Sequence, residues 1–133
     1  MAVTRGTVLG YAVAATGVIH LAFGLVNFGP PLRAMVDAGL VNSMGGAADR
    51  QATLWYFVAG GFLLTAGLTI RWADRLIGRV PPPMAWGLLV IAVLGVTIAP
   101  ASGFWLVLVE GVLLVLATRK AARDPVSRSA AES

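Results

Sequence analysis

Residues 6–32 read GTVLGYAVAATGVIHLAFGLVNFGPPL and contain no lysine, arginine, aspartate or glutamate. A helix that crosses the ~30 Å hydrocarbon core of a bilayer needs about 20 predominantly apolar residues. This stretch meets that requirement, and the sequence Gly29-Pro30-Pro31 would end a helix that begins near Thr7. We therefore predict a first membrane span over residues 7–28.

Two further apolar stretches follow along the chain. Residues 51–70 contain no charged side chain, and residues 80–118 contain only that of Glu110. The second stretch is too long for one crossing, and the sequence Pro100-Ala101-Ser102-Gly103 divides it. These stretches predict three more spans, over residues 53–70, 84–99 and 104–118.

The predicted fold is therefore all-α: a four-transmembrane-helix bundle in residues 1–118, followed by a basic, disordered cytoplasmic tail in residues 119–133. The composition agrees, with 58% hydrophobic and 12% charged residues and a mean hydropathy of +0.83. Soluble domains average roughly 25% charged residues, and disordered chains need low hydrophobicity. Both classes are excluded. A cleaved signal peptide is the competing interpretation of the first span, but the apolar stretch continues well past the candidate cleavage site at Ala12-Val13-Ala14.

The basic residues predict the orientation of the spans. With four spans, both termini and the loop after the second span share one side of the membrane. That side carries eight of the ten basic residues, whereas only Arg33 and Arg50 lie on the other. The positive-inside rule places both termini in the cytoplasm. We expect a bacterial plasma membrane, with contacts to membrane lipids and no nucleic-acid partner, because aromatic residues are not interleaved with the basic ones.

Small and polar residues recur along one face of the first span with a period of 3.5 residues. They are Gly10, Val13, Gly17, His20, Gly24 and Asn27. Glycines on such a face let membrane helices approach closely, so we expect this face to be packed against other helices. The other spans carry glycine pairs that could meet it: Gly60 and Gly67, Gly87 and Gly95, and Gly103 and Gly111.

His20 and Glu110 are the two side chains of the histidine or carboxylate kind within the predicted spans. At about 1.5 Å per residue, both lie roughly 9–12 Å below the outer membrane surface. A charged carboxylate in hydrocarbon costs about 2.5–3.5 kcal/mol or more, so Glu110 must be protonated, face a wet cavity or have a partner. We predict His20 and Glu110 as a catalytic proton donor and acceptor pair.

Four residues near the outer ends of the first two spans could complete a ligand-binding pocket around this pair: Asn27, Arg50, Trp55 and Tyr56. The expected ligand is a lipophilic small molecule, such as an isoprenoid, a quinone or a lipid, that enters from the bilayer. A single hydrogen bond from His20 to Glu110 or Asn27 that only holds two helices in register is the structural alternative. A homodimeric small-molecule transporter and a non-catalytic subunit or assembly factor of a larger membrane complex are the alternative functions, so an enzymatic role is left open.

No cofactor or metal is expected. The chain has no cysteine and one histidine, whereas a zinc site takes at least three protein ligands. A haem held between the His20 side chains of two copies has no support in the sequence beyond that count.

The segment Gly17-Val18-Ile19-His20-Leu21-Ala22-Phe23-Gly24, with Trp55-Tyr56-Phe57 at the start of the second span, resembles an uncharacterised family of small bacterial four-helix membrane proteins. The overall build is similar to that of DoxX-like proteins. The resemblance implies a four-helix bundle in the plasma membrane and supplies no particular activity.

Overall fold

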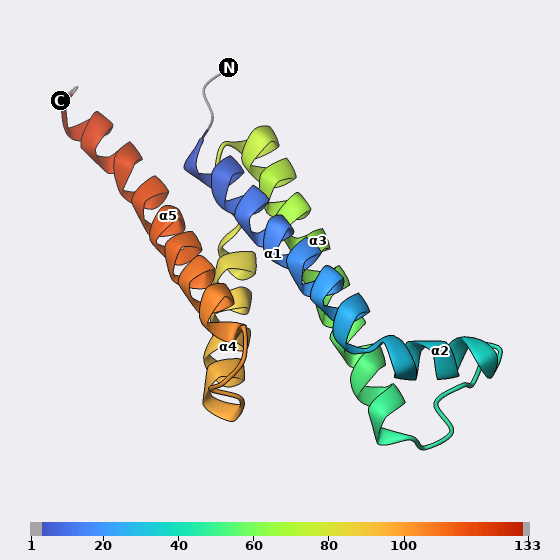
Figure 1. Ribbon diagram of the computed structural model, residues 1–133. Coiled ribbons are helices and arrows are strands. Elements are labelled where there is room, and N and C mark those ends of the chain that lie inside the picture. Colours follow the sequence, from blue (N-terminus) through green and yellow to red (C-terminus); the bar gives the residue numbers. More distant parts are fainter. Residues whose placement is uncertain (1–3, 132–133) are drawn as a thin grey trace.

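The computed structural model describes the backbone of residues 4–131 and the side chains of residues 4–122. Within this range the chain forms five helices and no strands (Figure 1). The helices are α1 (Arg5–Asn27), α2 (Gly29–Asp37), α3 (Ala48–Ile77), α4 (Pro82–Ile98) and α5 (Phe104–Ala131). The all-α prediction is confirmed.

The long helices form two antiparallel hairpins. α1 packs along α3, α4 packs along α5, and contacts between α1 and α5 join the two hairpins. The start of α1, the end of α3 and the end of α5 lie at one end of the molecule, while α2 and the turn between α4 and α5 lie at the other (Figure 1). The shorter helix α2 lies across the direction of α1 and α3.

Glycines bring α1 and α3 into backbone contact, as the sequence predicts. A Cβ atom added at Gly17 would lie 2.5 Å from the Leu64 backbone nitrogen, and one added at Gly10 would lie 2.7 Å from that of Arg71. Neither position has room for a side chain. We call this contact, together with Gly60 and Gly67 of α3, the glycine seam.

The predicted glycine contacts are only partly correct for α4 and α5. A Cβ atom at Gly111 would lie 2.9 Å from the Leu89 Cα atom, and one at Gly95 would overlap the Phe104 ring. By contrast, nothing lies within 4 Å of a Cβ atom added at Gly87 or Gly103. The prediction is wrong for these two glycines, which are both exposed, and Gly103 lies in the turn between α4 and α5.

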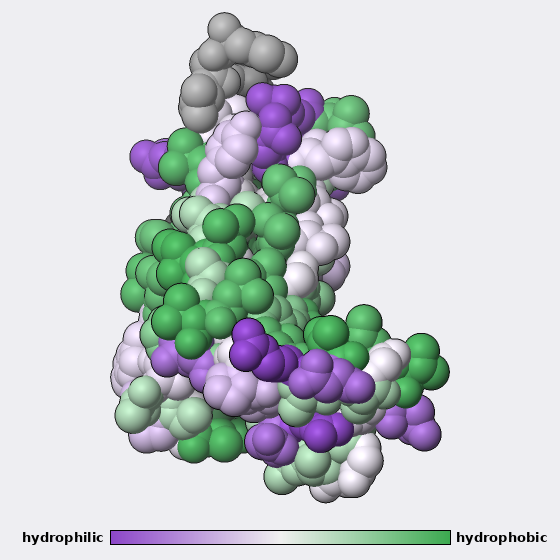
Figure 2. All heavy atoms as spheres, turned by 45° about the vertical axis from the view of Figure 1, so that its right-hand side comes forward, coloured by the Kyte–Doolittle hydropathy of each residue, from purple (hydrophilic) through white to green (hydrophobic). Residues whose placement is uncertain are grey.

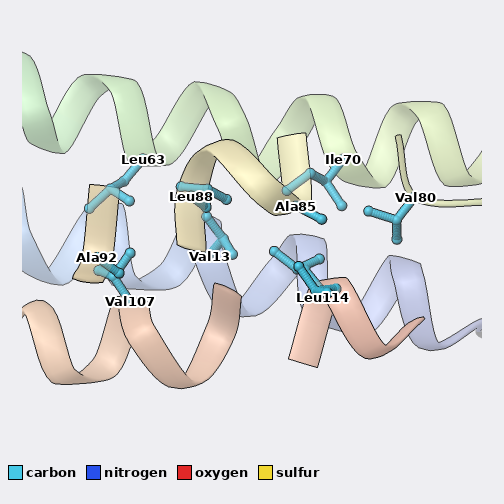
Figure 3. Packing of buried hydrophobic residues seen from close by; sticks show 10 residues of the cluster. Val13, Leu63, Ile70, Val80, Ala85, Leu88, Ala92, Val107 and Leu114 are labelled. Atoms are coloured by element: carbon cyan, nitrogen blue, oxygen red, sulfur yellow. The ribbon is translucent and has the colours of Figure 1, made fainter. Parts of the chain in front are cut away.

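A narrow apolar core runs between the hairpins. Figure 3 shows Val13 of α1, Leu63 and Ile70 of α3, Leu88 of α4 and Leu114 of α5 in one cluster. Most of the remaining large apolar side chains are exposed and form a broad apolar surface over the middle of the molecule, with hydrophilic groups nearer its ends (Figure 2).

Two of the described helices, α1 and α3, are long and apolar enough to cross a membrane. α4 is also apolar but has 17 residues. By length and composition, two helices could therefore cross a membrane, and the predicted four-span bundle is not confirmed.

Helix α3 is longer than the predicted span over residues 53–70. It begins at Ala48 and continues through Arg71, Asp74 and Arg75 to Ile77. Gly78 ends it with a left-handed φ of 67°, a conformation that glycine adopts without steric cost at a helix terminus.

Helix α2 was not predicted, because the sequence Gly29-Pro30-Pro31 was interpreted only as the end of the preceding span. Proline lacks a backbone N–H, but the first residues of a helix need no such donor. The two prolines of α2 occupy those first positions. The same rule correctly placed the proline run 81–83 at the start of α4.

Helix α5 also differs from its predicted extent. It continues as helix to Ala131, where the sequence predicted a disordered tail from residue 119. Alanine, arginine and lysine, which dominate residues 117–123, are among the strongest helix formers and extend α5 beyond its apolar part.

Candidate functional site

The carboxyl group of Glu110 lies inside the bundle. Its side chain, on α5, is only 5% exposed. The Thr16 hydroxyl of α1 donates a hydrogen bond of 2.6 Å to the Glu110 Oε1 atom. The second oxygen, Oε2, is buried and has no hydrogen-bond partner among the described residues.

The helical repeat explains why this polar group faces the core. Val107, Glu110 and Leu114 are three and four residues apart and therefore share one face of α5. Val107 and Leu114 both belong to the apolar core, so Glu110 lies between them at core level. Burial of a polar atom without a hydrogen bond is unfavourable, and such atoms are rare in native structures. The Oε2 atom thus needs a partner that the side chains around it do not supply.

His20 lies instead at the interface between α1 and α3. Its imidazole is half-buried and stacks on the Tyr56 ring, with 3.9 Å between ring centroids and 12° between planes. The Nε2 atom lies 3.1 Å from the Tyr56 carbonyl oxygen. Because a carbonyl oxygen only accepts, Nε2 donates this hydrogen bond. The Tyr56 ring also contacts Phe28, at 4.7 Å between centroids, so His20 is part of an aromatic cluster.

The structure therefore gives His20 and Glu110 different partners. No hydrogen bond or ion pair joins them among the residues whose side chains are described. Thr16 and His20 are four residues apart, so they lie one turn from each other on the same side of α1. Glu110 therefore contacts α1 one turn away from the histidine. The catalytic pair stays a prediction that no direct contact supports.

The other predicted ligand-binding residues do not gather around Glu110. Asn27 is exposed and donates to the Phe23 carbonyl of its own helix at 2.8 Å. Arg50 donates through Nη1 to the Ser43 carbonyl at 2.6 Å and so holds the loop before α3. Trp55 is 67% exposed. Of the predicted pocket, only His20 and Tyr56 are brought together.

A second buried carboxyl, that of Asp74, was missed in the sequence. The hydroxyls of Thr4 and Thr7 both donate to Asp74 Oδ2, the bond from Thr7 measuring 2.8 Å. Thr4 also caps α1 by accepting from the Thr7 backbone N–H. A threonine directly before an apolar helix is a recognisable N-cap signal. The contact between this N-cap and Asp74 of α3 joins distant parts of the chain, so the local sequence gives no signal for it. A negatively charged carboxylate is favoured at a helix N-terminus because of the helix dipole. The hydrogen bonds of Asp74 therefore link the start of α1 to the end of α3.

The part of the chain that the structure describes contains no set of side chains that could bind a metal ion. No three histidine, cysteine, aspartate or glutamate side chains gather there closely enough to hold an ion. The chemistry available at Glu110 is that of a carboxyl group with one hydroxyl donor in an apolar surrounding.

The fold and this carboxyl define a small all-helical protein with two candidate membrane spans and a polar group buried between its helices. The chain belongs to the family of unknown function DUF6463, whose model matches residues 4–121. The chain matches no curated protein and no solved structure. Membership of an uncharacterised family is thereby confirmed, while nothing in these comparisons links the chain to DoxX-like proteins.

Proposed function

We propose that the protein is a multi-pass protein of the bacterial plasma membrane that binds a lipophilic small molecule through Glu110. In this proposal α1, α3, α4 and the first part of α5 cross the membrane, and both termini are cytoplasmic. We also propose that the protein is bacterial and that its overall build is similar to that of DoxX-like proteins.

The exposed surface supports the membrane part of the proposal. Large apolar side chains are exposed along all four long helices, as are the four tryptophans, which are Trp55, Trp72, Trp86 and Trp105. Soluble monomers rarely expose apolar patches of more than a few hundred Å². The 17 residues of α4 would span roughly 26 Å at about 1.5 Å per residue, so a slightly thinned bilayer would accommodate it.

The unpartnered Oε2 atom of Glu110 is the observation that supports ligand binding. A ligand that donates a hydrogen bond, such as the hydroxyl of an isoprenoid alcohol, a quinol or a lipid, would satisfy this oxygen. Its apolar part would replace contacts with core residues such as Val107 and Leu114. Thr16 would hold the carboxyl in place through Oε1. Proton transfer between Glu110 and His20 is not part of this proposal, because His20 bonds to Tyr56.

Native mass spectrometry of the protein, extracted gently from its own membrane, tests the proposal. Wild type is compared with Glu110→Gln, which keeps the size of the side chain and removes the carboxyl. Asp74→Asn is the matched control, because it changes the other buried carboxyl, which has threonine donors. We expect a discrete lipophilic adduct on wild type and Asp74→Asn, and its loss from Glu110→Gln. If Glu110→Gln keeps the adduct, or if wild type carries no adduct, the proposal is refuted. The Thr16–Glu110 hydrogen bond would then have only the structural role of linking two helices.

A homodimeric transporter or a subunit of a membrane complex is the second candidate function, supported by the exposed face of α3. Thr65, Leu68, Thr69 and Trp72 line a hollow of about 390 Å³ on that face. Gly61 lies one turn before Thr65, and nothing is within 4 Å of a Cβ atom added there. Small residues spaced four apart are typical of membrane helix contacts. A dimer or a co-purifying protein in the same spectra would favour this function.

A further inference from the structure

Residues 29–46, which we call the α2 arm, extend sideways from the end of the α1–α3 hairpin. Phe28 ends α1 and directly precedes Gly29, the first residue of α2, so the chain turns without a loop. Figure 1 shows α2 lying across the direction of α1 and α3. A helix in this orientation at the end of a membrane bundle would lie parallel to the membrane plane.

The side chains of α2 are divided by polarity. Arg33 and Asp37 are four residues apart, share one face and are exposed. Met35 lies opposite this face, with Leu32 beside it, and Val36 lies at the flank between the two faces, since successive residues turn by about 100° around a helix with 3.6 residues per turn. Met35 is buried, whereas Val36 is exposed. The arm is therefore amphipathic, with part of its apolar face uncovered.

The loop after α2 adds two exposed aliphatic side chains. Leu40 is 61% exposed and Val41 is 88% exposed. Leu40 adopts a left-handed φ of 64°, which is uncommon for leucine. The loop is nevertheless held in place, because Arg50 of α3 bonds the Ser43 carbonyl at 2.6 Å. The loop thus holds Leu40 and Val41 in an ordered position in which their apolar side chains have few protein contacts.

The arm carries hydrophobic surface on one side (Figure 2). Figure 2 shows hydrophobic surface on the side of the arm that faces along the bundle, and hydrophilic surface on its outer side. A bilayer around the bundle would meet the arm on its hydrophobic side. The basic side chain of Arg33 would then lie at the level of lipid phosphate groups, with which its charge is complementary.

We infer that the α2 arm lies in the interfacial layer of the outer leaflet, with Leu40 and Val41 below the lipid headgroups, Val36 at their boundary, and Arg33 and Asp37 at the level of headgroups and water. This inference rests on the proposed membrane topology. Amphipathic helices at membrane surfaces bury their apolar face about 5–10 Å into the boundary between headgroups and acyl chains. The arm therefore has lipid, rather than a protein, as its partner.

Site-directed spin labelling of the full-length protein tests this inference, and the absence of native cysteine allows single-cysteine variants to be labelled directly. Val41→Cys carries the label on the arm's apolar tip, and Asp37→Cys is the matched control on its polar face. Val90→Cys, on the exposed surface of α4, is the reference for a membrane span. The labelled proteins are reconstituted into vesicles of phosphatidylcholine and phosphatidylglycerol. The collision rates of each label with oxygen and with a water-soluble nickel chelate are then measured.

We expect a several-fold higher ratio of oxygen to nickel accessibility at position 41 than at position 37, with position 90 higher still. If position 41 resembles position 37 while position 90 is in lipid, the arm inference is overturned and the membrane proposal stands. If position 90 is also open to nickel, the membrane proposal fails. A label at position 41 that neither reagent reaches would show a protein partner and would overturn the assignment to lipid.

Discussion

Replacing Gly17 by alanine perturbs the glycine seam at a close contact between the backbones of α1 and α3. The new Cβ atom would lie 2.5 Å from the Leu64 nitrogen, 2.9 Å from the Leu64 Cα atom and 3.0 Å from the Gly60 carbonyl oxygen. An ordinary contact of this kind measures 3.4–4 Å. The three atoms belong to backbone and cannot rotate away, so α1 and α3 must separate by about 1 Å, by the overpacking argument.

The expected cost follows from two opposing effects. Overpacking of a tight core typically costs about 1–3 kcal/mol, and here the separation also weakens the neighbouring contacts at Gly10 and Gly67. Alanine is the better helix former by about 1 kcal/mol, which offsets part of that cost. We expect a net loss of up to about 2 kcal/mol in the free energy of unfolding.

The assay is unfolding of the full-length protein in mild-detergent micelles by added dodecyl sulfate, followed by tryptophan fluorescence. Gly87→Ala is the matched control, because it lies within α4 and nothing is within 4 Å of its added Cβ atom. The control should gain up to about 1 kcal/mol from helix propensity alone. Equal stability of the two variants would refute the close backbone contact between α1 and α3.

Three further substitutions are measured in the same unfolding assay. Thr16→Val removes the only donor to Glu110 among the described residues and should cost about 1–3 kcal/mol, and no change would show that the buried carboxyl has other partners. Thr7→Val removes one of two hydroxyl donors to Asp74 and should cost about 1–3 kcal/mol; a neutral result would mean that this bond does not hold the start of α1. Gly78→Ala places a side chain at a φ of 67° and should destabilise by about 1 kcal/mol, whereas a gain in stability would contradict the left-handed end of α3.

The positions of the long helices could be predicted from the sequence because charged residues and prolines interrupt long apolar stretches. The face of α1 that carries Gly10 and Gly17 was also predictable, since a 3.5-residue period places small residues on one packed side. Helix α2 was not, because proline both ends and begins helices and the local sequence does not distinguish the two roles.

The partner of Glu110 could not be predicted for a different reason. Thr16 and His20 lie on the same side of α1, one turn apart, and both can donate a hydrogen bond. Which of them meets Glu110 depends on how far α5 is shifted along α1. Packing of the whole bundle determines that shift. In the structure Thr16 lies opposite the Glu110 carboxyl, while His20 donates its hydrogen bond to the Tyr56 carbonyl.

The glycine contacts of this protein fall into two kinds with different genetic consequences. A side chain added at Gly95 would meet the Phe104 ring, so a smaller residue at position 104 would relieve the overlap and act as a second-site suppressor. A side chain added at Gly17 would meet only the backbone of Leu64 and Gly60 among its nearest atoms. No exchange of amino acid removes a backbone atom. Loss of function caused by a larger residue at position 17 should therefore revert only through restoration of glycine itself, so selection cannot reshape the contact at Gly17 by paired substitutions.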